Sequence, residues 1–185
     1  MNIIVKTFRG GVCCRPDTSW EKENRDFYCP ECAGAIHWAP VVFARISKAG
    51  KCVGEKFASR YYDAMGFGML MYIGDLLPDI ASASCADHTT ILPFPLYNTV
   101  VFDNPDNAYS VNADGALLYS CSTLGCRKAI EEALCKSSAL TSVRTGDIVA
   151  VELAEPCLLS SRSDKEKVVA ATFCDNDLFD FKIIW

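Results

Sequence analysis

The sequence predicts a sheet-rich α+β domain that spans residues 1–185. The chain of 185 residues is 50% apolar, which is enough to bury one sizeable core. Many short apolar runs end in turn-forming residues, as β-strands do, and only about two segments repeat their apolar residues at helical spacing. Many strands with few helices indicate the α+β class.

The first half of the chain predicts two strands with a helix between them. The apolar run 39–46 predicts a buried strand that ends in a turn. Residues 55–65 place their large apolar side chains on one stripe, so we expect a helix there, closed by Gly66. The run 69–73 predicts a second strand that delivers Asp75 at its end.

The second half predicts a hairpin and a helix. The Asp114-Gly115 pair favours a tight β-hairpin. Ser122 or Thr123 is a suitable cap for a helix that runs to about Lys136.

Two further strands are expected near the C-terminus. The run 148–153 is apolar. After the turn 175–177, Phe179, Phe181 and Ile183 alternate with other residues, as in a half-buried strand.

Composition excludes several classes of function. The net charge of −5, without basic clusters, argues against nucleic-acid binding. No run reaches the ~18 apolar residues of a membrane span. The N-terminus becomes charged too early for a secretory signal, so we expect a cytoplasmic protein. The eleven cysteines are expected to be reduced and to serve as small buried hydrophobes.

Two local patterns leave other chemistry open. Cys29 and Cys32 form a CxxC that could hold zinc if a second pair of cysteines joined it. His88 follows Asp87 and lies three residues after Cys85, which allows a histidine base or a Cys–His nucleophile. Core packing for the cysteines and a surface position for His88 are the simpler interpretations.

The segment from Phe27 to Leu76 carries the most specific pattern in the chain. Its distinctive stretches are His37-Trp38-Ala39-Pro40-Val41, Glu55-Lys56-Phe57-Ala58, Arg60-Tyr61-Tyr62-Asp63 and Gly74-Asp75-Leu76. The segment resembles the metal-binding core of the fumarylacetoacetate hydrolase (FAH) superfamily. In that superfamily a strand reads roughly His-Tyr-Glu-x-Glu-Leu, and a later Arg-Asp-Leu brings a third carboxylate.

The resemblance implies an FAH-like fold, a mixed rolled β-sheet with about two helices, and a homodimer. Family members use Mg²⁺, Mn²⁺ or Ca²⁺ to hydrolyse, decarboxylate or tautomerise β-diketone and acylpyruvate substrates. Here the two Glu positions fall on Ala39 and Val41, and only Asp75 keeps a carboxylate. Methyl and isopropyl groups cannot bind a hard cation, so we expect Asp75 to be a vestigial ligand and no cofactor to be bound.

Other positions that the resemblance implies are also changed. Arg15 begins a stretch like the family's Lys-Pro-Asp-Ser, and Ser84 stands at the family's Lys, three residues before Asp87. These three residues are the expected substrate pocket. The catalytic histidine segment has no counterpart, and residues 151–154 replace the family's Thr-Gly-Thr-Pro loop.

Two functions follow from this pattern. The first is a divergent FAH-family pseudoenzyme with a binding or structural role, with room for a small-molecule ligand. The second is a metal-dependent hydrolase or isomerase of small oxo-acids, in which Glu152 and Glu155 rebuild a carboxylate cluster with Asp75. A cysteine-based metal or redox module is a third class.

Overall fold

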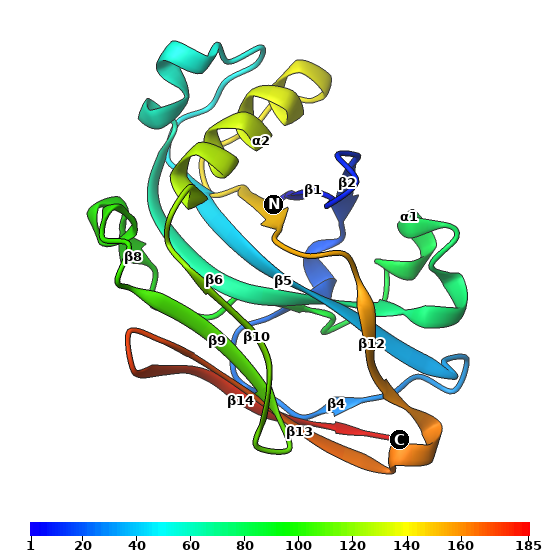
Figure 1. Cartoon of the computed structure of the whole chain (residues 1–185). Helices are drawn as coiled ribbons and strands as arrows, with labels where there is room; N and C mark the ends of the chain where they lie inside the picture. Colours follow the sequence, from blue (N-terminus) through cyan, green and yellow to red (C-terminus); the bar gives the residue numbers. More distant parts are fainter.

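Two β-sheets form the framework of the protein (Figure 1), whose computed structural model describes residues 1–185. The larger sheet has nine strands, and its main order is β2-β1-β11-β5-β6-β7-β3, with β12 paired to β5 and β8 paired to β6. The bounds of its strands are β1 Ile3–Lys6, β2 Val12–Arg15, β3 Trp20–Glu21, β5 Ala35–Ile46, β6 Tyr62–Ile73, β7 Thr90–Ile91, β8 Tyr97–Asn98, β11 Ile148–Glu152 and β12 Cys157–Ser161. The sheet is mixed, because β1 pairs parallel with β11 while β5 and β6 pair antiparallel.

The second sheet has five strands in the order β10-β9-β13-β14-β4. Its strands are β4 Phe27–Tyr28, β9 Ala108–Ala113, β10 Ala116–Ser122, β13 Glu166–Phe173 and β14 Asn176–Ile184. Figure 1 shows β9, β10, β13 and β14 lying against the long curved strands β5 and β6. Stacked aromatic rings, among them Phe67 and Tyr109 with centroids 4.6 Å apart, fill the space between the sheets.

Helices are few, as expected. The α-helices are α1 Ile80–Ala83 and α2 Cys126–Leu140, and the 3-10 helices are η1 Asp17–Ser19, η2 Glu55–Arg60, η3 Gly74–Leu76, η4 Thr99–Asp103 and η5 Arg162–Asp164. The α2 helix confirms the expected helix but begins after Gly125 rather than at Ser122 or Thr123. It buries Ile130, Ala133 and Leu134 against the main core.

The helix expected over residues 55–65 is wrong. Only η2 forms, and from Tyr62 the chain is already in β6, so Gly66 lies within a strand instead of closing a helix. The pairing with β5 explains the difference: Phe43 faces Gly66, and a Cβ added at Gly66 would lie 2.8 Å from the Phe43 ring. Pairing within the sheet therefore extends β6 toward the N-terminus, well beyond the expected run 69–73.

The predicted hairpin and C-terminal strand are confirmed. Asp114 and Gly115 both have positive φ (49° and 80°), as the tight turn between β9 and β10 requires. In β14, Phe179, Phe181 and Ile183 are buried between exposed residues. The α+β fold class is therefore correct. No helix of the structure has both the length and the apolar character needed to cross a bilayer.

The large sheet is buried on both faces. One face packs against the second sheet and α2 to form the main core. The opposite face, which we call the Tyr72 face, carries a smaller core of Ile3, Val5, Ala39, Val41, Phe43, Leu70, Tyr72, Ile148 and Ala150, together with Ala83 and Leu92. Burial of both faces explains why β5 and β6 read as nearly continuous apolar runs.

Candidate active site on the Tyr72 face

Alternation along the strands determines which candidate residues share the Tyr72 face. Side chains two residues apart on a strand point to the same side of the sheet. Ala39 and Val41 of β5 therefore share a face with Tyr72 of β6, whose direct partner on β5 is His37, and Glu152 of β11 is paired directly with Val41. On the face where the family's carboxylates are expected, the carboxyl group comes from Glu152 of the neighbouring strand β11.

Ala39 and Val41 are fully buried and pack against other apolar side chains. Neighbouring side chains therefore fill the space around both positions, and no hollow is left there. An isopropyl group and a methyl group offer no oxygen donors. No group of three or more His, Cys, Asp or Glu side chains is arranged to hold a metal ion. The residues present therefore do not fit the divalent metal that the resemblance implies.

Asp75 is held away from this face. It lies in η3, exposed, and its Oδ2 accepts a hydrogen bond of 2.7 Å from the backbone N–H of Gly34. That hydrogen bond, which favours the ionised form, is the main reason the pKa of Asp75 lies below its ordinary value. In the register of the sheet, Ala39 pairs with Leu70 of β6, and Tyr72 lies two residues further along on the same face, whereas Asp75 lies beyond the end of β6.

Tyr72 and Glu152 form the polar centre of the face. The Tyr72 hydroxyl donates a hydrogen bond to Oε1 of Glu152, and the backbone N–H of Phe8 donates to Oε2 at 2.7 Å. Burial raises the pKa of both side chains, and for Glu152 these two donors oppose the effect. Both carboxyl oxygens are thus already engaged within the protein.

A buried arginine completes this network. The Arg15 guanidinium lies over the Tyr72 ring, 4.8 Å from its centroid, and donates to the backbone oxygens of Met71 (2.6 Å) and Ser84 (3.3 Å) and to Oγ1 of Thr89 (3.1 Å). Burial lowers its pKa, but an arginine in a protein keeps its proton. The Tyr72 face thus holds a fixed positive charge supplied by the chain itself. Nη1 of Arg15 is buried without a hydrogen-bond partner.

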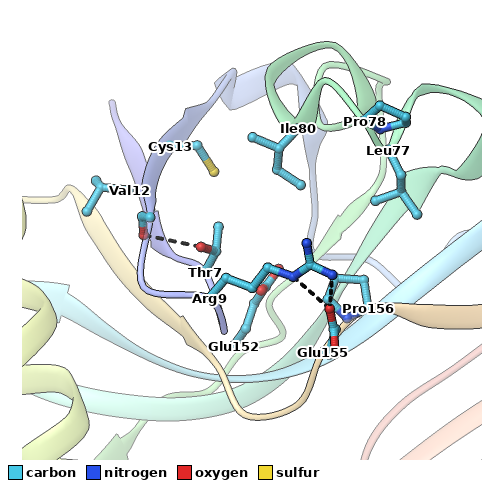
Figure 2. A pocket seen from close by; sticks show the side chains of 11 residues that line it. Thr7, Arg9, Val12, Cys13, Leu77, Pro78, Ile80, Glu152, Glu155 and Pro156 are labelled. Atoms are coloured by element: carbon cyan, nitrogen blue, oxygen red, sulfur yellow. Dashed lines mark hydrogen bonds and ion pairs between the residues drawn. The ribbon is translucent and has the colours of Figure 1, made fainter.

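A cavity of about 360 Å³ opens beside Glu152. Figure 2 shows Arg9 and Glu155 paired at one side of it, with Cys13 and Ile80 on the other side. Arg9 Nε donates to Glu155 Oε1 at 2.7 Å, and both side chains are largely exposed. Burial raises the pKa of the Cys13 thiol to about 11, so it is not a ready nucleophile.

The expected substrate pocket is only partly assembled. Arg15 and Ser84 meet through the Ser84 carbonyl, and the Ser84 hydroxyl caps α1 by donating to Ile80. Asp87 is exposed and lines a different cavity. Glu152 and Glu155 share the first cavity, but Asp75 does not join them.

The alternative sites do not assemble either, with one exception. All eleven cysteines are free, and Cys29 and Cys32 gain no further ligands. The expectation that the cysteines are buried hydrophobes is wrong for most of them, because only Cys126 is buried and five are exposed. His88 does pair with a carboxylate, yet that partner is Glu21 rather than the adjacent Asp87.

Sequence reasoning missed Tyr72 and Thr89 at this site. Tyr72 stood inside an apolar run, where its hydroxyl was the one group that needed a polar partner. Its partner, Glu152, lies 80 residues further along the chain and could not be assigned without the strand pairing.

Glu152→Gln is expected to change how stability depends on pH. Because the pKa of Glu152 is raised in the folded protein, the folded state binds this proton more tightly than the unfolded state. The free energy of unfolding should therefore fall as pH rises above the ordinary value of 4.5, and the variant should lose this contribution. Urea unfolding at successive pH values measures the free energy of unfolding of both proteins. Glu155→Gln is the control, and parallel curves for the wild type and Glu152→Gln would contradict the prediction.

Comparison with solved structures identifies the architecture. An FAH-family protein from Yersinia pestis CO92 superposes with a TM-score of 0.81 at 14% identity, covering 99% of this chain and 92% of the other. This chain has the FAH fold.

Two further FAH-fold structures match equally well. Fumarylpyruvate hydrolase from Pseudomonas aeruginosa, in complex with Mn²⁺ and pyruvate, gives a TM-score of 0.81 at 14% identity over 100% of this chain and 89% of that one. A probable 2-hydroxyhepta-2,4-diene-1,7-dioate isomerase from Mycobacterium abscessus gives 0.82 at 15% identity over 99% and 75%. No protein-family model and no curated protein sequence matches this chain. The FAH fold is therefore retained at very low sequence identity.

Proposed function

We propose that this FAH-fold protein binds a small molecule and does not perform metal-dependent hydrolysis or isomerisation. The observation that carries the proposal is the packing of Ala39 and Val41, which are fully buried among apolar side chains. A hard cation there would lose its hydration shell without gaining oxygen ligands. The cavity of about 360 Å³ beside Glu152 is in the size range of small-molecule sites.

The network around Arg15 also supports this proposal. A guanidinium already supplies positive charge to the Tyr72 face, and both oxygens of Glu152 already accept hydrogen bonds. A divalent ion near Glu152 would have to displace the Tyr72 hydroxyl or the Phe8 N–H and would be repelled by Arg15.

A metal-dependent hydrolase or isomerase of β-diketone or acylpyruvate oxo-acids is the second candidate. The solved structures favour it, because the neighbours include a fumarylpyruvate hydrolase and a probable isomerase. Glu152 favours it as well, since this carboxyl projects directly beside Val41.

Titration with Mn²⁺, Mg²⁺ and Ca²⁺ separates the two candidates. Under the first proposal the melting temperature stays constant, since nothing binds the folded state preferentially. A cation present at 100 times its dissociation constant would add about 2.7 kcal/mol, or roughly 5 °C or more in melting temperature. A rise that Glu152→Gln abolishes, together with turnover of acetopyruvate, would establish the second candidate instead.

Location and assembly are further parts of the proposal. Eleven free cysteines suit a reducing compartment, which supports the cytoplasm. A homodimer follows from the family resemblance, and the exposed Leu117 and Leu118 on the edge strand β10 support an association surface. Sedimentation equilibrium tests the assembly.

A further inference from the structure

A second and larger cavity lies away from the Tyr72 face. It measures about 820 Å³ and is bordered by β4, the end of β6 and the loop between α1 and β7. Its apolar lining includes Phe27, Pro30, Ile73, Leu76 and Ala86. None of its lining residues belongs to the cavity beside Glu152, so its function is independent of the function proposed above. Polar and charged residues, among them Arg25, Asp26, Ser82 and Asp87, also line the cavity, so it suits a small molecule with an apolar body and a polar substituent.

His88 supplies a polar group to the wall of this cavity. Its Nδ1 lies 2.9 Å from Oε2 of Glu21, a side chain that is only 6% exposed. The other oxygen, Oε1, accepts hydrogen bonds from the backbone N–H groups of Lys22 (2.8 Å) and Glu23 (2.7 Å). Glu21 is therefore fixed, and it holds the imidazole in one orientation.

The pairing with Glu21 determines which ring nitrogen remains available. A carboxylate accepts hydrogen bonds, so Nδ1 of His88 carries a proton and Nε2 has no protein partner. The His88 side chain is 52% exposed, which leaves it accessible to a ligand.

The backbone of His88 is also unusual. Its φ is +58°, in the left-handed region that residues other than glycine seldom occupy. Such conformations persist where the surrounding structure imposes them, and they are frequent at ligand sites. Here the bond to Glu21 and the adjoining strand β7, which pairs with β3, fix the segment.

We propose that this cavity binds a small ligand with a flat apolar body and an acidic hydroxyl, such as a phenol or an enol, and that His88 accepts the hydroxyl proton. The O–H bond breaks and an Nε2–H bond forms. The imidazole becomes an imidazolium that is paired with Glu21, and the ligand oxygen becomes an oxyanion beside it. An acidic hydroxyl suits this transfer, because the oxyanion that it leaves is stable enough to persist beside the imidazolium.

Titration with 4-nitrophenol tests the proposal, because the absorbance of this probe reports its ionisation. The chain has two histidines, His37 and His88, so two imidazole Cε1–H resonances are expected in the NMR spectrum. Binding should shift the His88 resonance saturably, leave that of His37 in place and increase the nitrophenolate absorbance. 4-Nitroanisole has the same aromatic body without the hydroxyl and should bind about tenfold more weakly or worse.

His88→Asn is the matched variant, because asparagine tolerates positive φ but is too short to reach the same ligand atom. It should weaken 4-nitrophenol binding by about tenfold or more. If this variant fails to fold, the comparison of 4-nitrophenol with 4-nitroanisole on the wild-type protein still tests the proposal. The proposal is overturned if the His88 resonance does not respond at millimolar 4-nitrophenol, if the two probes bind equally, or if folded His88→Asn binds as tightly as the wild type.

Discussion

Introducing carboxylates at the family positions, as Ala39→Glu with Val41→Glu, is expected to unfold the protein rather than to create a metal site. Both positions are fully buried in the smaller core. Two carboxylates there would lose hydration, and the buried cation on this face, Arg15, is already hydrogen-bonded. We expect a loss of at least about 5 kcal/mol, which is comparable to the whole stability of an ordinary domain.

Circular dichroism and urea unfolding, with and without Mn²⁺, measure this result. Arg45→Glu is the matched control, because it places a glutamate on the same strand at an exposed position. It should cost about 1 kcal/mol, through loss of the exposed ion pair with Asp63 and the solvent-screened repulsion between the two carboxylates. A folded double variant that Mn²⁺ stabilises would show that the face can still accommodate the ion.

Arg15→Ala is expected to destabilise the protein by about 3–5 kcal/mol. The substitution removes hydrogen bonds to the Met71 and Ser84 carbonyls and leaves a void beside the Tyr72 ring. It also leaves Glu152 without the nearby positive charge that favours its ionised form. Chemical denaturation at neutral pH gives the difference in the free energy of unfolding.

Arg9→Ala provides the comparison for Arg15→Ala. Arg9 is also an arginine near Glu152, but it is exposed and bonds only to the exposed Glu155. Its removal should change stability by about 1 kcal/mol or less. Similar effects of the two substitutions would mean that the buried network contributes little.

Local sequence patterns predicted the elements well where contacts between residues close in sequence determine the structure. The Asp114-Gly115 turn and the alternation of β14 depend on neighbouring residues, and both were predicted correctly. The segment 55–65 failed because its helical spacing competes with pairing to β5, which no local pattern reveals. In β6 the interstrand pairing determined the structure.

The candidate site was harder to predict because it depends on strand register. The sequence identified Ala39 and Val41 as apolar replacements, and the structure shows what surrounds them. The sequence could not show that Tyr72 shares their face of the sheet or that Asp75 turns toward Gly34. A shift of one residue in register reverses the face of every side chain, so the members of a site on a sheet follow from pairing.

The position of Arg15 has a consequence for how the sheet opens. Arg15 belongs to β2, at the edge of the large sheet, yet its guanidinium is bonded to the backbone of β6, with β1, β11 and β5 between them in strand order. An edge strand tied in this way cannot peel away without also breaking contacts at the centre of the sheet. The amides of β2 should therefore exchange with solvent in one cooperative unit with those of β6.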